Sequence, residues 1–390
     1  MFRVLLVFLS LSLQVAIYYY LWRRLIRDTK LRAPWRRRLT IALVCAGASV
    51  PLTVASRKIS VMIGQTLGWP VFIWLAVAGL TAVTLLAVDG AHLIAWVAGR
   101  AQGKSASNAP PNADRRAFLR RVGGGGALLT ATTGSAKGLY NALKTPPLIN
   151  QAITLSRLPQ SMNGFVIAQI TDLHVGNTIE KSFVRSVVER VNESKPDLIV
   201  LTGDMVDGPV SELAEHVAPL GDLQAPHGVF FVTGNHEYYA GVDAWVEHIR
   251  ELGIRVLRNE RVQIGDGEES FDLAGIDDHG AHRWPDHGAD LAKATRGRDP
   301  KRELVLLAHQ PRQVHEAKGA GVGLQLSGHT HGGQIWPWHY IVKTQQGGLL
   351  AGHSWHGDTQ LYISRGAGYW GPPVRVFARS EISRVILRCT

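Results

Sequence analysis

The stretch "LQLSGHTHGGQIW", residues 324–336, places a short strand-like run before a glycine turn that holds two histidines, His329 and His331. A His-x-His pair alone is weak evidence, because two histidines fall at this spacing by chance in many solvated loops. The same arrangement, a short apolar run followed by a potential metal ligand, recurs four more times in the chain. This recurrence predicts an α/β domain whose strands end at one polar site.

From about residue 148 onward, short runs rich in β-branched residues alternate with helical periodicity, which is typical of an α/β fold. A helix is predicted between the first two strands, where apolar residues recur at helical spacing from Phe183 to Val191. The predicted strands are residues 164–170, 197–203, 228–234, 271–276, 303–308, 323–328 and 360–364.

Side chains with oxygen or nitrogen ligand atoms directly follow five of these strands. In sheets with helical crossovers, residues far apart in sequence converge outside the carboxyl ends of the strands. The side chains that we expect to meet there are Asp172, His174, Asp204, Asn235, His236, His309, His329 and His331.

This mixture of side chains suits a pair of divalent ions. A carboxylate can bridge two cations and screen their repulsion, while neutral imidazole and amide oxygen complete each shell. Asp204 is the candidate bridge. Glycines before Asp204, Asn235 and His329 are expected to let the backbone turn sharply. Two such ions would activate a water molecule for in-line attack on phosphorus, so no cysteine nucleophile is required.

The motifs "DLH", "GD", "GNHE", "H" and "GHTH", in that order, resemble the calcineurin-like metallophosphoesterase family over about residues 164–334. Each fragment alone is weak, but five in order at strand ends form a specific pattern. The motif "GHTHGGQ" and the apolar N-terminal runs make the chain similar to the bacterial membrane-associated phosphodiesterase branch of that family.

The resemblance implies a four-layer αββα sandwich and two divalent ions, either Mn, Zn or Fe. It implies a shared ligand, Asp204, and a catalytic residue beside the phosphate, His236. The residues that it assigns to one ion are Asp172, His174 and His331. The residues that it assigns to the other ion are Asn235, His309 and His329.

Each predicted ligand also has a simpler explanation when it is taken alone. Asp172 could cap the following segment, Asn235 could form an Asx-turn, and His309 could be a satisfied core histidine. The whole set, in order and at strand ends, favours the metal site over these separate explanations.

Other polar residues of the domain carry weaker expectations. Arg365 and Tyr369, in "SRGAGYW", are predicted to contact a phosphate or a head group. Asp277 and Asp278 could line the pocket, although a role in a turn is the favoured interpretation. A solvated loop is favoured over a third metal site for His279, His282 and His287.

The basic character of the chain belongs to its N-terminal part. Residues 1–150 contain 19 Lys+Arg and 3 Asp+Glu, whereas the remainder contains 23 and 28. The basic residues flank apolar runs, so attraction to anionic lipid explains them better than nucleic acid does. We expect membrane lipids as partners and no nucleic acid.

Three apolar runs, residues 4–22, 39–55 and 68–99, predict about three membrane spans. The loops at 23–38 and 100–121 are rich in Lys and Arg, so the positive-inside rule places both of them in the cytoplasm. The alternative for the first run is a cleaved secretion signal, but it lacks a small-residue cleavage site.

The segment "RRAFLRRVGGGGALLTATTGSA", residues 115–136, resembles a twin-arginine export signal, with the export machinery as its partner. Export would place the C-terminal domain outside the cytoplasm, whereas a basic flank followed by a linker would leave it inside. The predicted organisation is a transmembrane region at 1–99, a basic linker at 100–147 and a phosphoesterase domain at 148–390.

The sequence thus predicts a multi-pass membrane protein that hydrolyses phosphate ester or pyrophosphate bonds, with a phosphorylated lipid or small molecule as substrate. One alternative is a phosphoesterase that acts on soluble nucleotides. Another is a non-catalytic metal-binding membrane regulator, against which His236 argues. A third is a transporter with an accessory domain, for which Asp89 is the acidic residue within the predicted spans.

Overall fold

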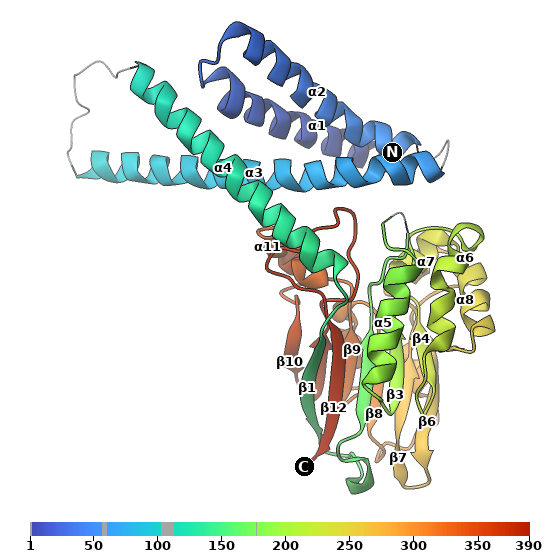
Figure 1. Cartoon of the computed structure of the whole chain (residues 1–390). Coiled ribbons are helices and arrows are strands. Elements are labelled where there is room, and N and C mark those ends of the chain that lie inside the picture. The colour runs from blue at the N-terminus through green and yellow to red at the C-terminus, as the bar shows by residue number, and fades with distance from the viewer. Residues whose placement is uncertain (1, 57–60, 103–112, 177) are drawn as a thin grey trace. The chain divides into compact units, whose positions relative to one another are not determined.

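The computed structural model describes residues 2–56, 61–102, 113–176 and 178–390 (Figure 1). The chain divides into two compact units. One comprises residues 1–139 and 371–374 and is helical; the other comprises residues 140–370 and 375–390 and holds both β-sheets.

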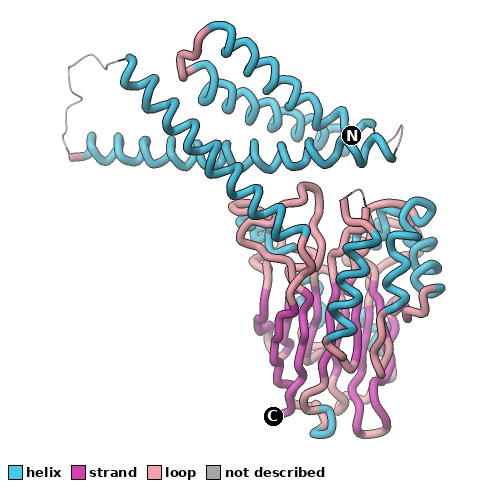
Figure 2. The backbone as a smooth tube through the Cα atoms, viewed as in Figure 1, coloured by secondary structure: helices cyan, strands magenta, loops and turns pink. Residues whose placement is uncertain are grey.

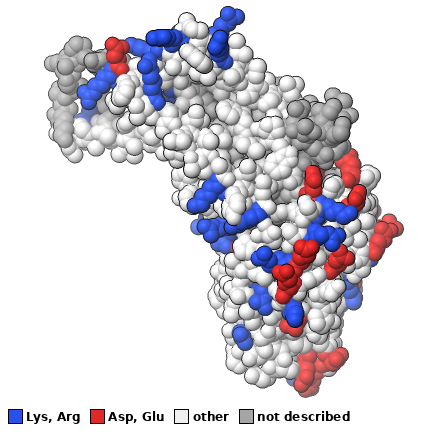
Figure 3. Space-filling view, in the orientation of Figure 1, with Lys and Arg blue, Asp and Glu red and all other residues white. Residues whose placement is uncertain are grey.

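Long helices form the helical unit (Figure 2). They pack on one another through a small apolar core of Leu21, Ala78, Ala82, Leu85 and Ala127. On the face shown in Figure 3, nearly all coloured side chains of this unit are Lys or Arg, as the charge count predicts. The helices are α1 (Phe2–Trp22), α2 (Ala33–Ser56), α3 (Val61–Ala101) and α4 (Ala113–Leu143), with a π-helical segment at Arg23–Arg27.

Helices occupy all three predicted spans. By length and composition, one segment among the described residues, Gly68–Ala101 within α3, could cross a membrane. The other two predicted spans, 4–22 and 39–55, extend into residues whose side chains lie outside the described part of the chain. The predicted export-signal segment, 115–136, lies within one continuous helix, α4, which includes Arg115 and the run of four glycines, whereas residues 103–112 of the predicted linker lie outside the described residues.

Asp89 is paired inside the helical unit. Asp89 accepts a hydrogen bond from Tyr20 Oη at 2.8 Å and forms an ion pair with Arg24 at 2.9 Å, which ties α3 to the end of α1. These contacts give Asp89 a structural role in the helical unit, which the transporter alternative does not require.

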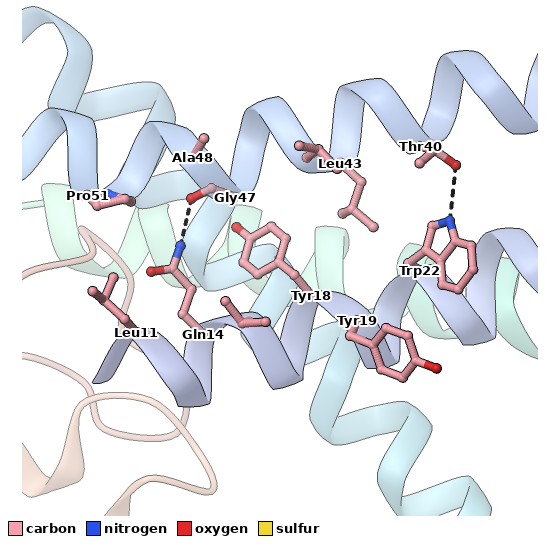
Figure 4. A pocket seen from close by; sticks show the side chains of 12 residues that line it. Leu11, Gln14, Tyr18, Tyr19, Trp22, Thr40, Leu43, Gly47, Ala48 and Pro51 are labelled. Atoms are coloured by element: carbon pink, nitrogen blue, oxygen red, sulfur yellow. Dashed lines mark hydrogen bonds between the residues drawn. The ribbon is translucent and has the colours of Figure 1, made fainter. Parts of the chain in front are cut away.

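An apolar cavity of about 530 Å³ lies between α1 and α2 (Figure 4). Its polar groups bond to one another: Gln14 donates to the Gly47 carbonyl at 2.6 Å, and Trp22 Nε1 donates to Thr40 Oγ1 at 3.1 Å. The remaining wall is apolar, with Leu11, Leu43 and other aliphatic and aromatic side chains.

Two six-stranded sheets form the centre of the α/β unit. The order in the first is β1-β12-β2-β3-β4-β5, and in the second β10-β11-β9-β8-β7-β6. The strands of the first sheet are β1 (Leu148–Leu155), β2 (Val166–Ile170), β3 (Leu198–Thr202), β4 (Val229–Val232), β5 (Arg255–Val256) and β12 (Ile382–Cys389). Those of the second are β6 (Glu260–Asp266), β7 (Glu269–Gly275), β8 (Leu304–Leu307), β9 (Leu324–Ser327), β10 (Gly352–His356) and β11 (Thr359–Ile363).

All seven predicted strands are present, as β2, β3, β4, β7, β8, β9 and β11. Strands β2 to β5 run parallel, as do β7, β8, β9 and β11. The strands without a prediction lie mainly at sheet edges. Among them, β1 and β12 pair in parallel register from Leu148↔Ile382 to Leu155↔Cys389. The outward-facing polar residues of β1 weaken its apolar signal.

Apolar clusters separate the layers. One lies between the first sheet and helices α5 (Lys181–Glu193), α6 (Val210–Val217) and α8 (Val242–Glu251), which cover one face in Figure 1. A second cluster fills the space between the two sheets. A third lies against the second sheet, where the helices are short: α9 (Leu291–Thr295) and α10 (Val314–Ala317). The two predicted central sheets are thus present, and the outer layer on the second sheet is mostly loop.

Candidate metal centre

The parallel strands of both sheets deliver the predicted ligands to one place. Asp172 and His174 follow β2, Asp204 follows β3, and Asn235 begins helix α7 (Asn235–Ala240) after β4. From the second sheet, His309 follows β8, and His329 and His331 follow β9. The side chains form two groups of potential ligands that meet at Asp204.

The first group consists of Asp172, His174 and His331, whose ligand atoms lie within 4.8 Å of one another. The Nε2 atoms of the two histidines face each other at 3.0 Å. His331 Nε2 lies 3.5 Å from Asp172 Oδ1, and His174 Nε2 lies 3.9 Å from Asp204 Oδ2. All three residues are buried.

The second group consists of Asp204, His309 and His329, within the same 4.8 Å. His309 Nε2 lies 3.0 Å from Asp204 Oδ2 and 3.2 Å from His329 Nδ1. Asp204 Oδ2 therefore approaches histidines of both groups, which is the position that a bridging ligand needs.

Asn235 supplies the clearest sign that a cation belongs here. Its side-chain oxygen is buried and has no hydrogen-bond partner among the described residues. Leaving such an oxygen unsatisfied is unfavourable, and native structures rarely do so without a ligand or water. A divalent ion would satisfy it and would also separate the facing imidazole nitrogens, so the donor set fits a metal centre.

Hydrogen bonds fix which ring nitrogen is free on two of the histidines. His309 Nδ1 lies 2.8 Å from the Thr202 carbonyl, and His174 Nδ1 lies 2.8 Å from Asp207 Oδ1. Both partners only accept, so each Nδ1 carries a proton and Nε2 is the ring nitrogen that remains to bind a metal once it carries no proton. Burial, followed by the charge on His309, lowers the pKa of His329 to about 3, so this ring is neutral. Burial would lower the pKa of His309 as well, but the charge of Asp204 raises it above its ordinary value.

His331 differs from the other histidines because Arg375 Nη2 lies 3.2 Å from its Nδ1. A guanidinium only donates, so this contact places the proton of a neutral His331 on Nε2. Ligation through Nε2 would therefore require that the contact with Arg375 be lost. The buried Arg375 also donates to the carbonyls of Gly368 and Ala378, which holds the segment beneath His331.

Five of the predicted ligands adopt a left-handed backbone conformation. Their φ angles are 55° for Asp172, 53° for His174, 55° for Asp204, 71° for His329 and 51° for His331. This conformation costs an L-residue roughly 1–2 kcal/mol. Strained residues cluster at functional sites, where the surrounding structure holds them in place.

The glycines that precede the ligands make room for the site itself. Gly203 has a φ of 85°, and a Cβ there would lie 2.6 Å from Gly234 N and 2.7 Å from His309 Nδ1. A Cβ on Gly234 would overlap the Asp204 carboxylate, and one on Gly328 would overlap Asp172. These positions require glycine because the ligands occupy the space of a side chain.

His236, the predicted catalytic residue, lies beside both groups and is paired with Asp207. Its Nδ1 lies 2.7 Å from Asp207 Oδ1, the oxygen that also contacts His174. Burial alone would lower the pKa of His236, but the charges of Asp204 and Asp207 raise it to about 9. The ring is therefore a cation at neutral pH in the metal-free protein.

Two carboxylates of the site were absent from the sequence-based set, Asp207 and Glu237. Glu237 is buried and accepts from the backbone N–H groups of Asp204, Met205 and Gly234, at 3.0, 2.7 and 2.6 Å. Burial and the nearby Asp204 raise the pKa of Glu237 to about 7. The motifs "GDMVD" and "GNHE" contain both residues, so their positions were the available signal.

Two predicted substrate-binding residues lie in different surroundings. Arg365 is partly exposed and forms an ion pair with Glu381 at 2.8 Å, next to the loop that follows His331. Tyr369 is buried in the first core cluster, and its hydroxyl donates to the Thr178 carbonyl at 3.0 Å. This geometry favours a packing role for Tyr369.

The polar residues of the 277–287 segment have local partners. Asp277 and His287 both contact Arg258, at 2.7 Å each. Asp278 accepts from Gly280 N at 2.7 Å, as expected of a turn, and also from the Gln310 side chain. His282 contacts the carbonyl of His279 and is exposed.

The family profile described as calcineurin-like phosphoesterase matches residues 165–333, which span every predicted ligand. A metallophosphoesterase of Bacillus subtilis, YkuE, is 32% identical over 287 residues, a match that covers 71% of this chain and 98% of the relative. The chain belongs to the calcineurin-like phosphoesterase family. The resemblance predicted from the motifs is thereby confirmed.

Other relatives of this phosphoesterase are longer than the matched region. A metallophosphoesterase of Helicobacter pylori (strain J99) is 38% identical over 248 residues, which cover 63% of this chain and 65% of the relative. A bovine protein named "Transmembrane protein with metallophosphoesterase domain" is 38% identical over 311 residues, which cover 76% of this chain and 67% of the relative. The matches thus span about two thirds of these two relatives.

Proposed function

We propose that this chain is a membrane-associated hydrolase that cleaves phosphate ester or pyrophosphate bonds with water activated by two divalent ions. The observation that carries the proposal is the donor set: the unpartnered Asn235 oxygen and two facing imidazole pairs that share Asp204. The proposal is also supported by the family match, because the matched family is one of phosphoesterases.

The chain's own residues would divide the work as follows. Asp172, His174 and His331 would hold one ion, and Asn235, His309 and His329 the other, with Asp204 shared. When bound, the ions lower the pKa of water and stabilise charge on the phosphoryl oxygens.

His236 would hold the proton that the leaving oxygen needs. Asp207 fixes the ring through Nδ1, which leaves Nε2 as the atom that donates the proton. A binding protein without catalysis would not need a charged, oriented imidazole beside its ions. The His236–Asp207 pair therefore favours an enzyme over a metal-binding regulator.

Membrane association is supported by the apolar segment Gly68–Ala101 and by the name of the bovine relative. A tethered hydrolase would act on a substrate of the membrane or envelope, such as a phosphorylated lipid. A soluble nucleotide is the alternative substrate class, since a tether can also retain an enzyme near a soluble substrate.

The test uses the full chain, purified in detergent, stripped of metal with a chelator and reloaded with Mn²⁺, Zn²⁺ or Fe²⁺. We expect turnover of a phosphodiester such as bis(4-nitrophenyl) phosphate to vanish on stripping and to return on reloading. His236→Ala should retain the metal and lose turnover by about 10²-fold or more. A protein that binds two ions and hydrolyses none of a panel of monoesters, diesters and lipid pyrophosphates would contradict the proposal.

A further inference from the structure

A group of large apolar side chains is exposed close to the metal centre. We call Trp336, Trp338, Tyr340, Ile341 and Phe377 the aromatic rim. Their exposed fractions are 39%, 55%, 62%, 44% and 89%. Single exposed apolar residues are common on soluble proteins, but five in two adjoining segments indicate an interaction surface.

The rim is a built structure. Its two segments are joined by backbone hydrogen bonds from Trp336 N to the Val376 carbonyl at 3.1 Å and from Val376 N to the Gln334 carbonyl at 2.9 Å. The rings of Trp336 and Phe377 meet edge to face, with centroids 6.5 Å apart. Backbone pairing therefore holds the exposed rings in position.

Phe377 is strained as well as exposed. Its φ of 61° is a left-handed conformation, which is a genuine outlier for a bulky residue. Exposure to water and backbone strain both disfavour phenylalanine here, and neither is offset by packing. Such a residue points to a function that requires an apolar tip at this place.

A cavity of about 450 Å³ opens beside the rim. Trp336 and Phe377 line it together with the basic side chains Lys343 and Arg365. Gly332, which also lines it, directly follows the predicted ligand His331. The cavity is thus lined both by the rim and by the turn that carries His331.

The charge of this region suits an anionic partner. Between residues 331 and 380 the sequence contains one acidic residue, Asp358, against four basic residues. Arg365 is neutralised by Glu381, whereas Lys343 is exposed and has no carboxylate within 4.0 Å among the described residues. Lys343 therefore remains a net positive charge at the mouth of the cavity.

The first residues of the α/β unit, 140–147, follow the predicted membrane region and pair with residues 380–382, shortly after Phe377. Ser380 Oγ donates to the Asn141 carbonyl at 3.3 Å, and Ile382 N donates to the Pro147 carbonyl at 3.0 Å. The entering chain itself exposes Tyr140, with the Lys144 ammonium 5.4 Å from the ring centroid.

We propose that the aromatic rim inserts into the interface of an anionic lipid bilayer, and that the cavity receives the phosphate of a lipid head group. Tryptophan and tyrosine prefer the head-group level of a membrane, and basic residues are attracted to anionic lipid. This inference rests on the proposed function for its substrate class, a phospholipid, but membrane docking by the rim is measured separately from hydrolysis.

The experiment places the full chain in nanodiscs, one copy per disc, made of phosphatidylcholine alone or mixed with phosphatidylglycerol. Cys45 and Cys389 are replaced by alanine, and one cysteine is introduced for a polarity-sensitive dye. Ile341→Cys reports from the rim. Glu268→Cys, in the tight turn between β6 and β7 at the other end of the sheets, is the control position.

We expect the dye at residue 341 to emit at a shorter wavelength in discs that contain phosphatidylglycerol, and the dye at residue 268 to be unaffected. Phe377→Ser and Lys343→Glu should each reduce the shift by at least half. Trp355→Ser, which removes a tryptophan of 62% exposure outside the cavity lining, is the matched control and should preserve it. Unchanged metal content would show that each variant is folded.

Emission at residue 341 that stays at the value of a water-exposed dye in both discs would overturn the proposal. An equal shift in both discs would overturn the assignment to anionic lipid. A shift that requires two copies per disc would identify a second chain as the occupant and would also overturn it. Failure of hydrolysis with the dye shift intact would refute the proposed function and leave rim docking standing.

Discussion

Asp207 joins two histidines with different tasks, because its Oδ1 lies 2.8 Å from Nδ1 of the predicted ligand His174 and 2.7 Å from Nδ1 of His236. On the first ring this bond would leave Nε2 to hold a metal, and on the second it favours the protonated form. The pKa of Asp207 is lowered, since its histidine partners outweigh the effect of burial. It is therefore an anion throughout the working range of pH.

Asp207→Asn should shift the alkaline limb of the pH–rate profile to lower pH. The carboxylate raises the pKa of His236, so its loss lowers that pKa, and the acid form is lost at a lower pH. Bound cations lower the same pKa in both proteins, so the comparison uses fully loaded enzyme. The measurement is kcat/KM from pH 6 to 10, and an unmoved limb would show that Asp207 does not act on the proton of His236.

Asn235→Ala should weaken the binding of one of the two ions. The mutation removes the unpartnered oxygen and leaves the other six ligands in place. We expect titration calorimetry on the chelator-stripped protein to show two sites in the wild type and one site weakened by about tenfold or more in the variant. Two unaltered sites would mean that Asn235 is no ligand.

At the scale of the elements, parallel strands and the turns that follow them produce the site. The turns after β2, β3 and β9 place ligands in the left-handed region, and glycines at 203, 234 and 328 lack a Cβ that would overlap a neighbouring ligand or its backbone. Strand and turn thus act as a unit, and damage to the turn should disturb metal binding before it disturbs the sheet.

Gly203→Ala tests this dependence, with Gly253→Ala as its control. Both glycines have positive φ, 85° and 79°, but a Cβ at 253 has nothing within 4 Å. The control should lose about 1–2 kcal/mol of unfolding free energy from backbone strain alone. Gly203→Ala adds a clash with Gly234 and His309, so we expect a larger loss and reduced metal content, measured by denaturant unfolding and metal analysis. Equal effects would show that the space beside Gly203 is not required.

Sequence patterns identified the central strands and the ligands but not the edges or the supporting contacts. Buried strands such as β3 and β8 are short apolar runs that end at a ligand, so composition and position agree. Strand β12 is adjacent to β2 only because the chain returns from the far end of the sequence. Asp207 had only its place in the motif "GDMVD" as a signal and Arg375 had none, since their importance depends on distances that only the fold fixes.

At the scale of the whole molecule, a strongly basic helical unit is joined to a slightly acidic hydrolase domain. The basic loops and the twin-arginine-like segment at 115–136 lead us to propose that the domain lies outside the cytoplasm. In the structure this segment is helix α4, which would have to cross the membrane for that orientation.

A reporter fused at Thr390 tests the orientation. We expect an alkaline phosphatase fusion, which is active only outside the cytoplasm, to be active. Replacing Arg115 and Arg116 by lysine should reduce the phosphatase signal if the pair directs export. A phosphatase fusion that is produced but inactive would place the domain in the cytoplasm. That result would reverse the orientation and leave the chemistry of the site unaffected.

The most direct test of the central claim, a pair of cations held around Asp204, is X-ray absorption spectroscopy on the full chain loaded with Mn²⁺. The account predicts two ions per chain, nitrogen and oxygen ligands, and a metal–metal distance of roughly 3.5–4 Å that disappears in Asp204→Asn. One ion per chain, or two ions without a metal–metal feature in the wild type, would contradict it.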